Sequence, residues 1–315
     1  MGFETIGSVP LWAGFVAFVV AMLAVDLGLF HRKAHEVSTK EALGWSAVWV
    51  ALAALFNVGV YLWFGGGPAL QFATGYLIEK ALAVDNIFVF VVIFSTFATP
   101  AVYQHRVLFW GVLGALVMRA VFIFLGGAFI QRFHGAAYVF GAILAFTGIK
   151  LLLRRHEEPH PERNPLVRAF QRIFPVTPEL AGPRFTVVRE GRRFATPLLL
   201  ALVAVEVTDL VFAVDSIPAI FAVTQDPFIV FTSNIFAILG LRSLYFLLAR
   251  AITRFAYLKV GLSVVLIFVG AKMLLADVFE VPVAVSLGII AGILATSILS
   301  SFFKSTDVPR KPLEN

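Results

Sequence analysis

The stretch VEVTDLVFAVDSIPAIF, residues 205–221, decides the fold of this chain. It is apolar enough to cross a lipid bilayer, yet it holds Glu206, Asp209 and Asp215. A charged side chain at the centre of a membrane helix costs about 2.5 to 3.5 kcal/mol on insertion scales. Carboxylates kept in such a stretch are therefore expected to face one another, water or a ligand.

The acidic pattern occurs twice in the chain. EKALAVDNI at 79–87 matches DLVFAVDSI at 209–217, and two further matches follow in the same order. The matches pair Glu79 with Asp209, Asp85 with Asp215, Arg119 with Arg242 and Lys150 with Lys272. Ordered matches of this kind predict an internal repeat.

The composition is that of a membrane protein. Of 315 residues 60% are hydrophobic and 14% are charged, with a mean hydropathy of +0.91, whereas soluble domains carry about 25% charged residues. The chain has no Cys, which excludes disulfides, iron–sulfur ligation and thiolate zinc sites. It also lacks the GxxxxGK[ST], HExxH and GxSxG motifs, so we expect neither direct use of ATP nor an enzyme.

Apolar runs of about 20 residues, the length needed to cross a bilayer, occur nine times. They are residues 9–30, 43–64, 72–95, 105–129, 134–153, 195–222, 228–249, 256–276 and 282–303. The predicted fold is an all-α polytopic membrane protein of about nine transmembrane helices with an inverted three-plus-three helix repeat. Its expected parts are two N-terminal helices (1–71), repeat 1 (72–153), a basic cytoplasmic linker with an interfacial helix (154–194), repeat 2 (195–276), and a last helix with a cytoplasmic tail (277–315).

The basic residues predict the orientation. If the N-terminus lies outside, nineteen Lys and Arg fall in the inner loops and the tail, and only Arg132 falls outside. Because Lys and Arg favour the cytoplasmic side, we expect an outer N-terminus and a cytoplasmic C-terminus in a bacterial inner membrane. This distribution also explains the high pI without nucleic acid as a partner. The two repeats then lie in opposite orientations, as in carriers that bind their substrate near the bilayer midplane.

The charged residues inside the predicted spans form a candidate ion site. The expected metal ligands are Glu79, Asp85, Glu206, Asp209 and Asp215. Neutral oxygen ligands are available from Asn57, Asn86, Thr208, Ser216 and Asn234. The expected counter-charges, interpreted mainly as structural ion pairs, are Arg119, Lys150, Arg242 and Lys272. An all-oxygen ligand set favours Mn²⁺, Mg²⁺ or Ca²⁺ over Zn²⁺ or Cu⁺; the role of Asp26, outside the repeat, stays open.

Helix geometry makes this site more specific. If spans three and six pack antiparallel, Asp85 comes level with Asp209 and Glu206, while Glu79 comes level with Asp215, which gives two separate clusters. Pro218 removes a backbone hydrogen bond, so a kink or an unwound turn is expected beside Asp215.

The acidic motifs resemble those of the TerC/Alx family, part of a wider superfamily that includes the lysine exporters. The segments that carry the resemblance are FATGYLIEKALAVDNIFVF at 72–90, VEVTDLVFAVDSIPAIFAVTQDPF at 205–228 and TSNIFAILGLRSLYF at 232–246. The resemblance implies paired three-helix repeats, Mn²⁺ efflux and, by name, tellurium resistance. It carries over onto the five carboxylates as the acidic motif positions, although Ala83 stands where the family commonly has Ser.

The leading functional hypothesis is a secondary transporter that exports a divalent metal ion, with Mn²⁺ first and Ca²⁺ open, in exchange for protons. The alternative is a non-transporting membrane scaffold or a stress-response factor that acts through the basic linker. Amino-acid export rests on superfamily analogy alone. Transport direction, stoichiometry and oligomeric state are left open by the sequence.

Overall fold

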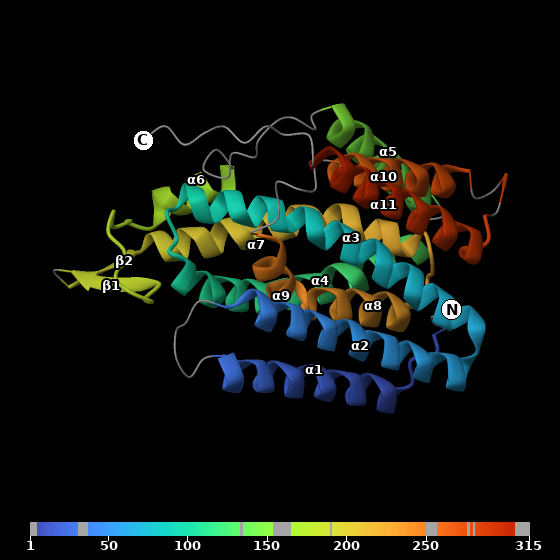
Figure 1. The fold of residues 1–315 in the computed structure, drawn as a ribbon, viewed down its shortest axis with the longest axis horizontal. Coiled ribbons are helices and arrows are strands. Elements are labelled where there is room, and N and C mark those ends of the chain that lie inside the picture. The colour runs from blue at the N-terminus through green and yellow to red at the C-terminus, as the bar shows by residue number, and fades with distance from the viewer. Residues whose placement is uncertain are drawn as a thin grey trace.

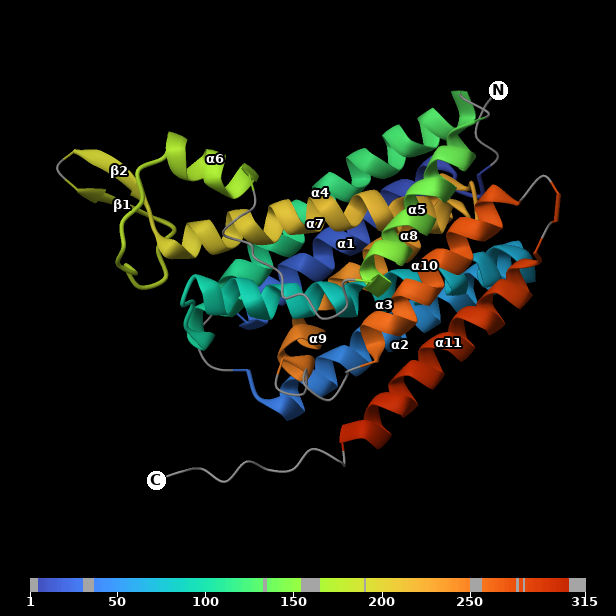
Figure 2. The same ribbon diagram turned by 90° about the horizontal axis from the view of Figure 1, so that it is seen from above.

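The computed structural model of the protein describes residues 5–30, 37–132, 135–153, 165–189, 191–249, 257–275, 278–279 and 281–305. Within the helices, a few side chains lie outside this description, including those of Asp26, Asp85 and Asp215. The described residues form an elongated bundle of helices, with one small hairpin at its end (Figures 1 and 2).

Helices occupy all nine of the apolar runs. They are α1 (Val9–Phe30), α2 (Thr39–Phe64), α3 (Gly66–Thr96), α4 (Ala101–Arg132), α5 (Ala136–Leu153), α7 (Pro197–Phe221), α8 (Pro227–Leu239), α9 (Leu241–Leu248), α10 (Leu258–Leu274) and α11 (Val283–Ser305). The run 228–249 forms two helices, because α8 ends at Gly240 and α9 leaves it at an angle of 41°.

The helices confirm an all-α membrane protein. Within the described residues, α2, α4, α7 and α11 are long and apolar enough to cross a bilayer, and the bent pair of α8 and α9 would make a fifth span. The apolar parts of α1, α5 and α10 are shorter, and α3 carries Glu79, Lys80 and Asp85 close together. Nine spans remain a prediction.

The backbone shows no unwound turn beside Asp215, and a kink there stays a prediction. Helix α7 continues through Pro218 to Phe221, and the chain breaks instead at Gly240 in the following run. A proline lacks the N–H that would bond four residues back, but a helix tolerates this loss when its neighbours hold it in place. Glycine at 240 has no side chain to resist the sharper change of direction.

The linker folds partly as predicted. Helix α6 (Pro165–Ile173) is amphipathic, with Val167 buried in the same apolar cluster as Leu198 of α7. The side chains of Ile173 and Phe174 are 74% and 49% exposed, and the contact of this helix with a lipid surface stays a prediction. An unpredicted antiparallel hairpin follows, β1 (Thr186–Arg189) and β2 (Arg192–Ala195).

Helix α8 lies at the centre of the bundle. All its residues except Phe231 are buried, and it packs against α3, α4 and α2. Its N-terminus is capped by Asp226, whose carboxylate accepts the backbone N–H of Phe228 at 2.8 Å. Aromatic rings of α1, α2 and α3, including Phe15 and Phe56, pack around Phe236. A short helix with so little contact with lipid is well placed to carry polar side chains.

Small residues bring α5 and α10 into close contact. A Cβ atom on Gly270 would lie 2.6 Å from the backbone nitrogen of Ala145, and one on Gly148 would lie 2.8 Å from the carbonyl oxygen of Ser263. Backbones approach this closely only where side chains are absent, which is the usual packing of membrane helices. The α5–α10 contact is a rigid seam between the two predicted repeats.

Candidate metal centre

A single guanidinium lies at the centre of the candidate site. Arg119 of α4 forms ion pairs with Glu79 of α3 and Asp209 of α7, and all three side chains are at most 3% exposed. The contact with Asp209 is two-pronged, with Nη2 3.2 Å from Oδ1 and Nε 3.4 Å from Oδ2. Such a fork geometry fixes both groups in direction as well as distance.

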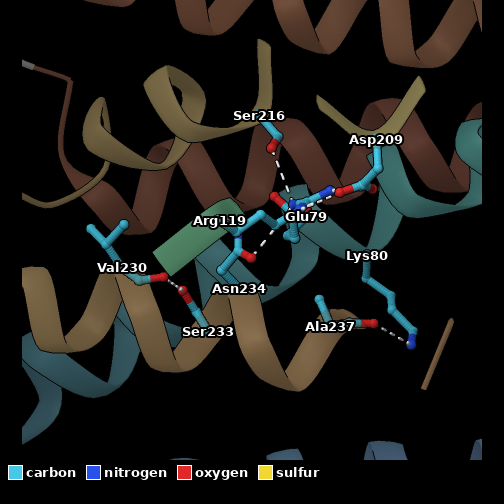
Figure 3. Close-up of polar contacts among 9 residues, drawn as sticks. All are labelled: Glu79, Lys80, Arg119, Asp209, Ser216, Val230, Ser233, Asn234 and Ala237. Carbon is cyan, nitrogen blue, oxygen red and sulfur yellow. Dashed lines mark hydrogen bonds and ion pairs between the residues drawn. The ribbon is translucent and has the colours of Figure 1, made fainter. Parts of the chain in front are cut away.

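Two neutral side chains complete this arrangement (Figure 3). Nη1 of Arg119 donates to Ser216 Oγ at 3.2 Å and to Asn234 Oδ1 at 3.5 Å. Ser216 belongs to α7 and Asn234 to the buried helix α8. Four of the predicted ligands, Glu79, Asp209, Ser216 and Asn234, therefore surround one cation from the chain itself.

The predicted division into two clusters is wrong for these residues. Glu79 and Asp209, which were expected at different depths, share Arg119. Matching residues of two antiparallel helices lie at the predicted depths only if the helix axes are aligned. The long side chain of Arg119 can also span the remaining difference in depth between Glu79 and Asp209. Apart from its ion pair, the Glu79 carboxylate has no hydrogen-bond partner among the described residues.

Glu206, which lies on α7, is the third carboxylate of this cluster. It is partly buried and lies close enough to Asp209 for the two charges to repel each other. Its carboxylate packs against α4, where a Cβ atom on Gly114 would overlap it. The absence of a side chain at Gly114 thus makes the space for Glu206, a requirement that the sequence alone did not reveal.

The remaining predicted ligands are placed differently. Asp85 and Asp215 are helical, but their side chains, like that of Asp26, lie outside the described residues. Asn57 is partly buried on α2, and its Oδ1 has no hydrogen-bond partner among the described residues. Thr208, one residue before Asp209, is also partly buried. Among the described side chains, no three of His, Asp and Glu are arranged to hold a metal ion.

The other predicted counter-charges do not share the position of Arg119. Arg242 is buried at the start of α9, beside Trp49 and Phe109. Lys150 and Lys272 lie in the last turns of α5 and α10, and neither forms an ion pair with a described residue. Lysines near helix ends reach toward the interface with their long stems, so their presence needs no buried partner.

Lys80 is a functional candidate that sequence reasoning left outside the site. Its Nζ donates to the carbonyl oxygen of Ala237 at 3.2 Å, close to the end of α8 (Figure 3). A cation at the C-terminus of a helix is stabilised by the helix dipole and by the carbonyls that lack partners there. Lys80 thus contacts the last turn of α8 just before the break at Gly240. Its position directly after Glu79 was the sequence signal that could have included it in the candidate site.

A cavity of about 80 Å³ adjoins the Arg119 cluster. Its polar lining comes from Asn86, Arg119, Thr147 and Ser216, and its apolar lining includes Leu266. Asn86 is 2% exposed, and its side-chain nitrogen has no hydrogen-bond partner among the described residues. The cavity is polar on one side and has room for ordered water.

These features define a polytopic helical membrane protein whose bundle encloses a charged cluster. The profile of the integral membrane protein TerC family matches residues 64–308. A Myxococcus xanthus relative, the uncharacterized membrane protein STKORF319, is 61% identical over 307 residues, covering 98% of this chain and 96% of the relative. The chain therefore belongs to the TerC family.

Two further relatives show how widely this sequence is shared. The Escherichia coli (strain K12) protein called "Putative membrane-bound redox modulator Alx" is 49% identical over 306 residues, with 94% of this chain and 95% of the relative covered. An uncharacterized membrane protein of Rickettsia bellii is 40% identical over 300 residues, with 95% and 99% covered. No solved structure matches the chain.

Proposed function

We propose that this protein is a secondary carrier that exports a divalent metal ion, with Mn²⁺ the leading cargo, in exchange for protons. The observation that carries the proposal is the buried meeting of Glu79 and Asp209, with Ser216 and Asn234 beside them. Ionisable residues inside a membrane are costly and are usually kept for transport. Carboxylate, hydroxyl and amide oxygens are the ligands that hard divalent cations prefer.

The charges of the cluster support a cationic cargo. Three carboxylates, Glu79, Asp209 and Glu206, lie near one guanidinium, so the cluster has an excess of negative charge unless it takes up protons or a cation. A metal ion would replace protons on these oxygens, which is the chemical basis for exchange of the two. An oxyanion such as tellurite would be repelled by the same groups.

Helix packing supports the proposed inverted repeat. In that repeat α3 corresponds to α7, α4 to α8 with α9, and α5 to α10. Helix α3 packs on α8 while α4 packs on α7, and α5 packs on α10. Exchange of the two repeats leaves this set of contacts unchanged, as expected of a carrier built around an approximate two-fold axis. The inner-membrane location and the outer N-terminus belong to the same proposal.

The alternative is a protein that affects stress responses without transport. The Escherichia coli relative is called a redox modulator, but this chain has no Cys, so a thiol–disulfide mechanism is closed to it. A redox effect through altered metal content of the cell would agree with the carrier. A scaffold that works through α6 and the hairpin would not need three carboxylates inside the bundle.

The test is Mn²⁺ binding by the purified protein, measured by calorimetry, together with Mn²⁺ flux in proteoliposomes. Asp209→Asn keeps the size of the side chain and removes its charge, so we expect loss of most binding and flux in a protein that still folds. Glu179→Gln is the matched control, because Glu179 lies in the linker, its side chain is 72% exposed, and its carboxylate pairs with the surface residue Arg189. If folded Asp209→Asn binds Mn²⁺ as the wild type does, the carrier proposal fails and the scaffold becomes the better explanation.

A further inference from the structure

Arg119 occupies the place that a metal ion would need. Its nitrogens lie 3.2 to 3.5 Å from oxygens of Asp209, Ser216 and Asn234, and it also pairs with Glu79. A divalent cation bound by the same oxygens would sit at about 2.0 to 2.6 Å from each of them. The guanidinium and the ion cannot both fill this position, because two cations would have to occupy the same space between these oxygens.

The cavity offers the guanidinium a second position. Arg119 and Ser216 both line it, so the head of the arginine already borders this space. Asn86 lines the same cavity, and its amide nitrogen has no hydrogen-bond partner among the side chains that the structure describes. The oxygen and nitrogen of an amide can exchange places by rotation, so Asn86 can turn its oxygen toward a cation. The cavity is large enough for a guanidinium to replace the water that it would hold.

From these positions we infer that Arg119 is a tethered substitute for the cargo ion. It neutralises Glu79 and Asp209 when the carrier is empty, and it withdraws into the cavity beside Asn86 when a divalent cation binds. This inference rests on the proposed function and assigns a role to a cation that the sequence suggested was structural. Binding of the ion then has to overcome the ion pairs of Arg119, so the empty carrier is kept stable at the expense of affinity.

The inference predicts opposite effects for two neighbouring substitutions. Arg119→Gln removes the competing cation, so Mn²⁺ should bind at least about tenfold more tightly, a change of about 1.4 kcal/mol. Asn86→Leu removes the polar group of the second position, so Mn²⁺ should bind about tenfold more weakly. The heat stability of Arg119→Gln should also rise more on addition of Mn²⁺ than that of the wild type, because its carboxylates lack a cation until the metal arrives.

The double variant separates this role from direct ligation. If Asn86 acts through Arg119, Asn86→Leu should have no effect on Mn²⁺ binding once Arg119→Gln is present. If Asn86 is itself a metal ligand, the loss is the same in both backgrounds, and the inference is overturned. A purely structural Arg119 would give Arg119→Gln a weaker or unchanged affinity, which also overturns it.

The measurement is calorimetric Mn²⁺ binding by the wild type, both single variants and the double variant. If Arg119→Gln fails to fold, Asn86→Leu alone tests the inference. An Mn²⁺ affinity of Asn86→Leu equal to that of the wild type would rule out the cavity beside Asn86 as the second position of the guanidinium. A wild type that binds Mn²⁺ while the variants contradict these directions removes only the role of Arg119. Absence of Mn²⁺ binding by both the wild type and Arg119→Gln removes the proposed function as well.

Discussion

Asp226 ties the start of the described chain to the central helix, and its replacement should weaken the fold strongly. Its carboxylate accepts the Thr5 hydroxyl at 2.7 Å and the Ile6 N–H at 2.8 Å. It also accepts the N–H groups of Phe228 and Ile229 at 2.8 and 3.4 Å, which caps α8.

The size of the loss follows from these four hydrogen bonds. Removal of a helix N-cap costs about 1 kcal/mol, and each of the two bonds to Thr5 and Ile6 contributes about 1 kcal/mol. Asp226→Ala should therefore lower the free energy of unfolding by about 3 kcal/mol. At about 2 °C for each kcal/mol, the midpoint of thermal unfolding should fall by about 6 °C.

The assay is thermal unfolding in detergent followed by tryptophan fluorescence, because a chain without Cys offers no site for thiol-reactive dyes. Trp12 is a local probe, since its ring lies 5.1 Å from that of Phe228. Asp226→Ser keeps a good capping oxygen but is too short to hold Thr5 and Ile6, so it should lose about 2 kcal/mol. An Asp226→Ala protein that unfolds at the wild-type temperature would refute this account of the N-terminal segment.

Two pairs of glycines give further predictions. Gly270→Ala places a Cβ atom 2.6 Å from the backbone in the α5–α10 seam and should cost about 1 to 3 kcal/mol of stability. Gly288→Ala, which meets no described atom within 4 Å, should leave the unfolding temperature unchanged. Gly114→Ala should displace the Glu206 carboxylate and weaken Mn²⁺ binding in calorimetry. In Gly111→Ala on the same helix, the new Cβ atom would lie 2.8 Å from a methyl group of Val205 and close to no described carboxylate, so this change should affect stability and not metal affinity. Equal affinities for both α4 variants would contradict a role for Glu206.

Much of the fold could be predicted because the hydropathy of each segment can be read directly from the sequence. Runs of apolar residues predict where helices lie, and helices occupy each of the nine runs. The break at Gly240 was missed because one glycine in an apolar run is a weak local signal. The contact of Lys80 with the carbonyl of Ala237 beside the break joins residues 157 positions apart. The hairpin at 186–195 had a weak local signal, since Gly191 follows a short run with Thr186, Val187 and Val188.

The sequence identified several residues of the candidate site but not how they are arranged around Arg119. Glu79, Asp209, Ser216 and Asn234 were all recognised as oxygen ligands because of their residue type and their place in apolar runs. Their meeting around Arg119 depends on contacts across 90 to 115 residues of sequence for the α7 and α8 partners. Spacing rules along one helix cannot supply such contacts, because they do not fix how neighbouring helices are rotated about their axes.

The joints between helices differ greatly in the freedom that they allow. Helices α2 and α3 are separated by Gly65 alone, which adopts φ 86° and leaves no slack between them. Helices α5 and α7, in contrast, are joined by the long segment that contains α6 and the hairpin. A rotation of α3 must therefore move α2 at their shared end, whereas α7 can tilt without pulling on α5 through the connecting chain. Helix α10 stays tied to α5 by their close backbone contact. If the molecule rocks between two shapes, the stiff corner at Gly65 and the long segment before α7 decide which helices travel together.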